Sequence, residues 1–133
     1  MINLSFNSFC QKRVLGAEKL GLCSFYANKF DGLQTANGEK YDKDQFTAAH
    51  KSLPFNTILA VFNLETEKYV IVRVNDRGPY RKTRLIDISR AAAVELGIVS
   101  RGIAKVKIRI LGFDNFQNLE PIDPPGLEAE FKN

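Results

Sequence analysis

The sequence has few of the side chains that most often bind metals. It contains one histidine, His50, and two cysteines, Cys10 and Cys23, with no Cys-x-x-Cys motif and no cluster of the two residue types. A structural zinc site needs four such ligands. The sequence therefore predicts no metal site, and the absence of a P-loop or dinucleotide fingerprint predicts no bound cofactor. The two cysteines can form one disulfide, and the sequence leaves their redox state open.

Long apolar runs are also absent. No window of about 18 apolar residues occurs, so we expect no membrane-spanning helix. The first ten residues lack a basic region and do not resemble a signal peptide, and the residues before Cys10 do not resemble a lipidation site. We therefore expect a chain without an evident lipid anchor, and the true start of the protein can lie upstream.

The charge is unevenly distributed. The chain carries a net charge of +4, which divides into +8 for residues 1–111 and −4 for residues 112–133. A basic body attracts anionic polymers, although such a charge can also serve only to keep a domain soluble. The sequence shows no surface of alternating basic and aromatic residues and no nucleic-acid-binding motif. We therefore expect no nucleic-acid partner.

Short apolar segments separated by turn residues dominate the sequence. They predict strands over residues 22–27, 46–50, 57–63, 69–75, 85–88 and 104–111. Ser89 is a good N-cap for a helix over Arg90–Leu96, with Gly97 at its end, and a second short helix is predicted over Phe9–Leu20. In the last strand Lys105, Lys107 and Arg109 alternate with apolar residues and are expected on the solvent face.

This pattern predicts a mostly-β fold, a small closed barrel with one or two short helices. The 133 residues suffice for one domain. We expect residues 1–20 to be an N-terminal extension, residues 21–111 to be the barrel domain, and residues 112–133 to be an acidic, proline-rich tail.

Several polar loops contain groups that could carry acid–base chemistry. Asp76 directly follows an apolar strand, where partial burial favours a proton donor, although an aspartate in that position can simply cap its turn. Asp87, between two isoleucines, is expected either to pair with Arg73, Arg77, Arg81 or Arg84 or to act as a cap. His50 and Tyr26 have equally plain interpretations as structural and core residues. Separated carboxylates in a polar cleft suit acid–base work on a glycosidic bond.

Together these stretches resemble the rare lipoprotein A family, from about Gly21 to Leu111. The resemblance is carried by their order and spacing: Ser24-Phe25-Tyr26, Thr35-Ala36-Asn37-Gly38-Glu39, Thr47 to Pro54, Val72 to Tyr80, and Arg84 to Ser89 with Ala91-Ala92-Ala93. It implies a six-stranded double-psi β-barrel in the periplasm or cell envelope. It also implies endolytic transglycosylase activity, which cleaves peptidoglycan glycan strands to 1,6-anhydromuramic ends.

The resemblance assigns roles by position. Asp76 is the expected catalytic acid/base, with Glu39 and Asp87 as further carboxylates of the catalytic site. Four residues are expected to bind the substrate: His50, Tyr26, Asn37 and Arg77. The expected partner is the glycan strand, and the chain is expected to act as a monomer.

Three positions depart from the family pattern. Phe25 stands where the family has tryptophan, Ala27 where it has glycine, and Asp31-Gly32-Leu33 where it has His-Gly-Arg. Because these changes remove stacking area and two polar groups, they weaken expected substrate affinity more than the chemistry. The alternative hypothesis is a non-catalytic, expansin-like module that binds peptidoglycan.

Overall fold

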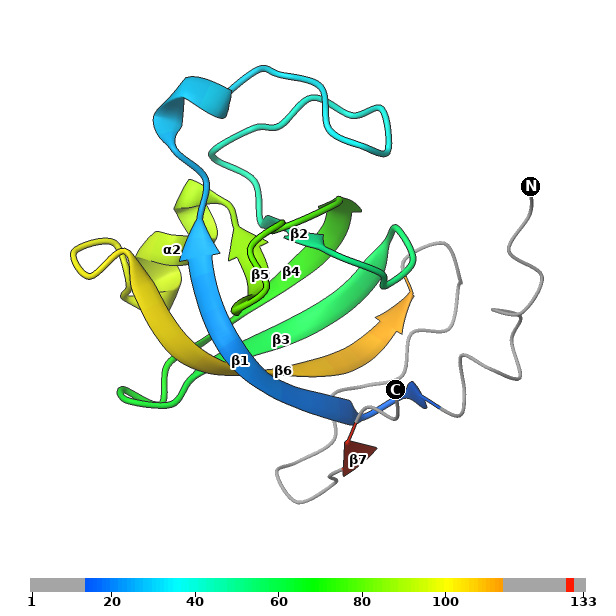
Figure 1. The fold of residues 1–133 in the computed structure, drawn as a ribbon, viewed down its shortest axis with the longest axis vertical. Helices are drawn as coiled ribbons and strands as arrows, with labels where there is room; N and C mark the ends of the chain where they lie inside the picture. The colour runs from blue at the N-terminus through cyan, green and yellow to red at the C-terminus, as the bar shows by residue number, and fades with distance from the viewer. Residues whose placement is uncertain (1–13, 114–128, 131–133) are drawn as a thin grey trace.

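The computed structural model describes residues 14–113 and 129–130. Its strands are β1 (Ala17–Phe25), β2 (Thr47–His50), β3 (Thr57–Asn63), β4 (Tyr69–Asp76), β5 (Arg84–Ile88), β6 (Ile103–Phe113) and β7 (Ala129–Glu130). A short 3-10 helix, η1, spans Asn28–Phe30, and the helix α2 spans Arg90–Leu96. Figure 1 shows the six long strands curving around a common interior, with α2 beside them.

The barrel closes through a pairing between β1 and β5. Hydrogen-bonded neighbours follow the order β5-β2-β4-β3-β6-β1, and the β1–β5 pairing completes the ring. Two pairings, β1–β5 and β2–β4, are parallel, and the other four in the ring are antiparallel. The prediction of a mostly-β, six-stranded closed barrel is confirmed.

Alternation along each strand fills the interior with branched apolar side chains. Eight of them are at most 1% exposed: Leu59, Val61, Val72, Val74, Ile86, Ile88, Val106 and Ile108. Fully burying a side chain of this kind contributes roughly 1.5–3 kcal/mol relative to leaving it in water. The same alternation turns Asp87, which lies between Ile86 and Ile88, away from the interior.

The predicted hairpin and helix are present. β3 and β4 are antiparallel neighbours, and α2 begins and ends where the sequence predicts. The hydroxyl of Ser89 accepts a hydrogen bond from the backbone N–H of Ala92 at 3.3 Å. Gly97 ends the helix with a φ of 77°, a left-handed conformation in which glycine lacks the steric penalty of other residues.

Two sequence predictions are wrong. Ala17–Leu20 belongs to β1 and is not helical, while residues 9–13 lie outside the described residues. Arg109 is not on a solvent face: it is 5% exposed and forms a buried ion pair with Glu18 at 2.5 Å. A buried guanidinium requires such a partner, and the alternating pattern of β6 did not reveal that β1 supplies one.

The ends of the barrel extend beyond the predicted core. β6 continues to Phe113, and β7 pairs in parallel with the start of β1. Cys23 is a free, buried thiol whose pKa is raised by burial, whereas Cys10 lies outside the described residues. Within residues 14–113 and 129–130, no helix is long and apolar enough to cross a membrane.

Candidate active site

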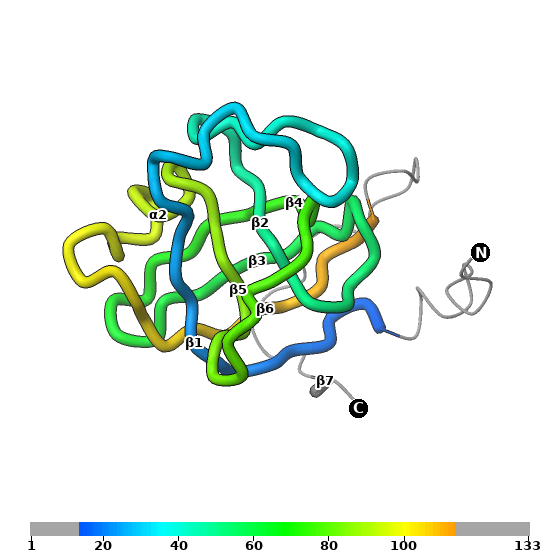
Figure 2. The backbone as a smooth tube through the Cα atoms, turned by 45° about the horizontal axis from the view of Figure 1, so that its top comes forward, coloured from blue at the N-terminus to red at the C-terminus, as the bar shows by residue number. Residues whose placement is uncertain are grey.

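One row of the barrel wall brings two candidate carboxylates into the same neighbourhood. In the strand register, Ala49 of β2 pairs with Asp76 of β4 on one side and with Asp87 of β5 on the other. Ser24 of β1 pairs with Asp87 in turn. Because neighbouring strands lie about 4.8 Å apart, the Cα atoms of the two aspartates are roughly 10 Å apart. In the ribbon and tube views the long β1–β2 segment lies across the end of the barrel at which β1 ends (Figures 1 and 2).

The carboxylate of Asp76 is held by three hydrogen-bond donors. The hydroxyl of Tyr26 donates to Oδ2 at 2.5 Å, and the backbone N–H groups of Ala36 and Arg77 both donate to Oδ1 at 2.8 Å. Tyr26 and Ala36 lie at two separate points of the β1–β2 segment, and Arg77 follows Asp76, so the carboxylate is fixed between that segment and its own turn. A side chain fixed in this way is suited to proton transfer at a defined position.

Tyr26 lies close to both aspartates. Burial raises the pKa of its phenol, and the hydrogen bond to Asp76 and the charges of Asp76 and Asp87 raise it further. The phenol therefore stays protonated and acts as a donor. Its ring stacks on Tyr41 with centroids 4.3 Å apart and meets Phe30 edge-on at 6.1 Å, and both contacts hold the hydroxyl against Asp76.

Asp87 has a different partner from the ones predicted. Its Oδ1 accepts a hydrogen bond from the hydroxyl of Ser24, the residue opposite it on β1. Among the described residues none of the four expected arginines forms an ion pair with Asp87, so the prediction of an arginine partner is wrong. The reason is topological: the parallel β1–β5 pairing, which periodicity cannot reveal, brings Ser24 alongside.

Glu39 forms a two-pronged ion pair with Arg73. Its Oε2 accepts from Nη1 at 2.9 Å and its Oε1 from Nη2 at 3.0 Å, and Oε1 also accepts from the side-chain amide of Asn75 at 3.0 Å. The hydrogen bond from Arg73 is the main cause that lowers the pKa of Glu39 to about 2. A carboxyl with this pKa is ionised near neutrality and has no proton to donate.

The segment from Thr35 to Glu39 is tied to the end of β4 by these contacts. The side chain of Asn37 works inside the segment, where its Oδ1 accepts from the hydroxyl of Thr35 at 2.8 Å and from the backbone of Glu39 at 3.0 Å. Its backbone N–H donates to the carbonyl of Asn75 at 3.3 Å. Asn37 therefore shapes the segment that supplies the Ala36 N–H to Asp76.

Arg77 points toward the loop after β2. Its Nη1 donates to the carbonyls of His50 and Leu53 at 3.2 and 2.8 Å, and the guanidinium lies 4.1 Å from the centre of the Phe55 ring. The side chain therefore braces this loop, while its backbone N–H contacts Asp76.

His50 is the last residue of β2, directly before this loop. It is 6% exposed, and its Nδ1 accepts backbone hydrogen bonds from Ser52 and Leu53 at 3.1 and 3.0 Å. Burial, followed by the positive charges of Arg77, Lys19 and Lys51, lowers its pKa to about 4. The imidazole is therefore neutral at physiological pH.

The structure thus gathers Asp76, Tyr26 and Asp87 in one place, and it directs Glu39, Asn37 and Arg77 into supporting contacts. Sequence reasoning missed Ser24 and the N–H of Ala36. Periodicity could reveal neither, because Ser24 reaches Asp87 through the parallel β1–β5 pairing and Ala36 reaches Asp76 from a distant segment. The described residues contain no group of three histidine, cysteine, aspartate or glutamate side chains arranged to hold a metal ion.

Comparison with known proteins gives this geometry a context. Residues 19–108 match a family model described as lytic transglycolase. The chain is 56% identical over 93 residues to an endolytic peptidoglycan transglycosylase RlpA of Haemophilus influenzae, covering 70% of this chain and 32% of that protein. It is 43% identical over 111 residues to the Pasteurella multocida protein of the same name, covering 84% and 38%. The chain therefore spans about a third of the length of these relatives.

Solved structures agree on the fold. Streptomyces papain inhibitor superposes with a TM-score of 0.58 at 21% identity, covering 71% of this chain and 94% of the inhibitor. An expansin of Clavibacter michiganensis superposes with a TM-score of 0.57 at 19% identity, covering 82% and 52%. With the family match over most of the barrel, the predicted double-psi architecture and the resemblance to rare lipoprotein A are confirmed. The chain belongs to the lytic transglycolase family of double-psi β-barrel domains.

Proposed function

We propose that this domain cleaves peptidoglycan glycan strands as an endolytic transglycosylase, with Asp76 as its acid/base. The observation that carries the proposal is the fixed carboxylate of Asp76 at the end of β4, held by Tyr26, Ala36 and Arg77. The names of the relatives, which denote peptidoglycan transglycosylases, supply the reaction class.

The reaction needs one group that first donates and then accepts a proton. Protonated Asp76 donates to the glycosidic oxygen as its bond to the muramic C1 breaks. The C6 hydroxyl of the same muramic residue then attacks C1, and its proton passes to the Asp76 carboxylate. The products are a 1,6-anhydromuramic end and a free 4-hydroxyl, no water is consumed, and the aspartic acid is regenerated.

The other side chains support this step. Asp87, held by Ser24 near the Tyr26 phenol, is the second carboxylate beside the sugar. Glu39 is ionised and cannot act as the acid, so we assign it to positioning the segment that supplies the Ala36 N–H. The wall of peptidoglycan lies outside the cytoplasmic membrane, so this function places the domain in the cell envelope, in the periplasm of a Gram-negative cell. All of the proposed groups come from one chain, which is consistent with a monomer.

The test is a digest of purified sacculi followed by mass spectrometry of the released fragments. Wild-type protein should release fragments with 1,6-anhydro ends, and Asp76→Asn should reduce their rate of release by about 10²- to 10⁴-fold, the usual cost of removing a general acid. Asp87→Asn is the matched control. If Asp87→Asn loses all activity while folded and Asp76→Asn keeps it, the roles are reversed. If wild-type protein binds sacculi and releases no anhydro ends, the domain is a binding module.

A further inference from the structure

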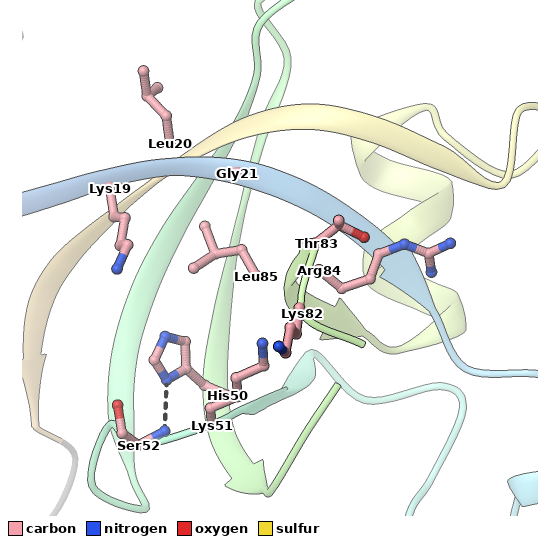
Figure 3. Close-up of a pocket in the computed structure, with 10 residues that line it drawn as sticks. All are labelled: Lys19, Leu20, Gly21, His50, Lys51, Ser52, Lys82, Thr83, Arg84 and Leu85. Carbon is pink, nitrogen blue, oxygen red and sulfur yellow. Dashed lines mark hydrogen bonds between the residues drawn. The ribbon is translucent and has the colours of Figure 1, made fainter. Parts of the chain in front are cut away.

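A pocket of about 230 Å³ lies between β1, the end of β2 and the start of β5. It is lined by Lys19–Gly21 of β1, by His50–Ser52 at the end of β2, and by residues 82–85 at the start of β5 (Figure 3). Three lysines and one arginine line it, and no acidic side chain does. A concave surface of one charge sign concentrates the field and attracts the opposite charge.

The charged groups converge on the pocket. In Figure 3 the ammonium group of Lys19 points toward the His50 ring, and that of Lys82 points into the space between β1 and the end of β2, whereas the Arg84 guanidinium points away. The ammonium group of Lys51 donates to the backbone carbonyl of Arg81 at 3.1 Å. Because Nδ1 of His50 accepts two backbone hydrogen bonds, the neutral ring carries its proton on Nε2, which faces the pocket. The pocket therefore offers only hydrogen-bond donors and positive charge from these four side chains.

The pocket lies within reach of the same substrate as Asp76. His50 directly follows Ala49, the register partner of both Asp76 and Asp87. Leu85, which lines the pocket, precedes Asp87 by two residues along β5, at the point where the β1–β5 register shifts. At about 3.3 Å per residue, this separation is roughly 7 Å along the strand. Neighbouring groups of one glycan chain can occupy both places.

We propose that this pocket binds a carboxylate carried by the glycan strand that Asp76 acts on; the inference therefore rests on the proposed function. Its volume is below the roughly 300–1,000 Å³ of pockets that enclose a whole drug-sized ligand, so it suits a small anionic group. Peptidoglycan offers two such groups. One is the lactyl carboxylate of muramic acid in strands stripped of peptide, and the other is a carboxylate of the stem peptide.

The test compares two double variants with equal loss of charge. Lys51→Gln with Lys82→Gln removes two exposed pocket cations, and Lys68→Gln with Lys105→Gln removes two exposed cations that do not line the pocket. Binding is measured for peptide-free glycan strands, for peptide-bearing strands, and for neutral chitin oligosaccharides. Since exposed ion pairs each contribute a factor of a few, we expect the pocket variant to bind a carboxylate-bearing strand about tenfold more weakly. Its affinity for chitin oligosaccharides should not change.

The pattern of loss identifies the source of the carboxylate. If only the affinity for peptide-free strands falls, the pocket binds the lactyl carboxylate. If only the affinity for peptide-bearing strands falls, it binds a carboxylate of the stem peptide. If both affinities fall, the pocket accepts either carboxylate. Equal losses in the two double variants, or no loss in the pocket variant, overturn the proposal. If the pocket variant fails to fold, Lys82→Gln alone repeats the test with an expected loss of about threefold.

The assay separates this inference from the proposed function. The same binding comparison made in an Asp76→Asn background should show the same tenfold loss, because binding to the pocket needs no bond cleavage. Absence of anhydro products from wild-type protein would therefore refute the transglycosylase while leaving the carboxylate pocket supported.

Discussion

Replacing Tyr26 with phenylalanine tests whether the Asp76 carboxylate is positioned by the phenol. The variant removes one oxygen, and with it the 2.5 Å hydrogen bond to Oδ2 of Asp76. The ring remains, so its stacking on Tyr41 at 4.3 Å should persist. The two backbone donors to Oδ1, from Ala36 and Arg77, are also unchanged. The change is therefore confined to one of three contacts.

The expected size follows from the partners involved. A hydrogen bond to a charged group contributes about 1.5–3 kcal/mol, and water reaching the half-buried site of Tyr26 restores part of it. We expect a net loss of about 1 kcal/mol in the free energy of unfolding, which lowers the melting temperature of a domain of this size by roughly 4–8 °C. If the same loss of about 1 kcal/mol falls on the transition state, the reaction should also be about fivefold slower, since 1.4 kcal/mol corresponds to a factor of ten.

A double-mutant cycle with Asp76→Ala isolates the interaction. Thermal unfolding of Tyr26→Phe, Asp76→Ala and the double variant should show that the hydroxyl matters little once the carboxylate is gone. Kinetics on peptide-free glycan strands should show a lower kcat with KM nearly unchanged, because the phenol positions Asp76 and does not hold the sugar. Additive stability losses, or a change confined to KM, would refute this reasoning and would instead make Tyr26 a substrate-binding residue.

Three further predictions follow from the supporting contacts. The pKa of His50 is about 4 in the folded state, below its unfolded value of 6.5. The free energy of unfolding should therefore fall by at most about 3 kcal/mol as the pH drops from 6.5 to 4. His50→Asn, which keeps an acceptor near Nδ1, should not show this decline in urea titrations. The Glu39 carboxylate stabilises the fold above pH 4.5, and wild type loses this stability as the pH falls toward 2. Glu39→Gln should lack it, at a cost near neutrality of only about 0.5 kcal/mol because Glu39 is 43% exposed. A large loss at pH 7 would contradict this prediction. Ser24→Ala should lower the free energy of unfolding by about 1 kcal/mol through loss of the hydrogen bond to Asp87, and an unchanged melting curve would show that water replaces the hydroxyl.

Local signals account for most of the fold that could be predicted. The helix α2 was predicted to the residue because both of its ends carry their own chemistry, a Ser89 cap and a left-handed Gly97. The hairpin of β3 and β4 was predictable for the same reason, since two apolar strands flank a short polar turn. Such features depend on neighbours in the sequence and are visible without knowledge of the barrel.

Features that depend on distant pairing escaped prediction. The interpretation of Arg109 as a solvent-facing residue failed because Glu18, 91 positions earlier, neutralises it inside the structure. The helix predicted up to Leu20 failed because β6 and β7 pair with this segment as a strand, overriding its weak local preference. In each case the decisive partner lies on a strand whose position only the closed topology determines.

The site itself combines both kinds of information. The strand end made Asp76 only a candidate, and the family resemblance selected it, while its three donors come from residues 26, 36 and 77. The turn N–H of Arg77 is local, whereas Tyr26 and Ala36 reach Asp76 only because the β1–β2 segment crosses the end of β4. Glu39 shows the consequence: the family resemblance assigned it to the catalytic site, yet Arg73 and Asn75 of β4 bind it and lower its pKa to about 2. An acid/base therefore differs from a structural carboxylate by its partners, and those partners are set by the crossing of distant segments.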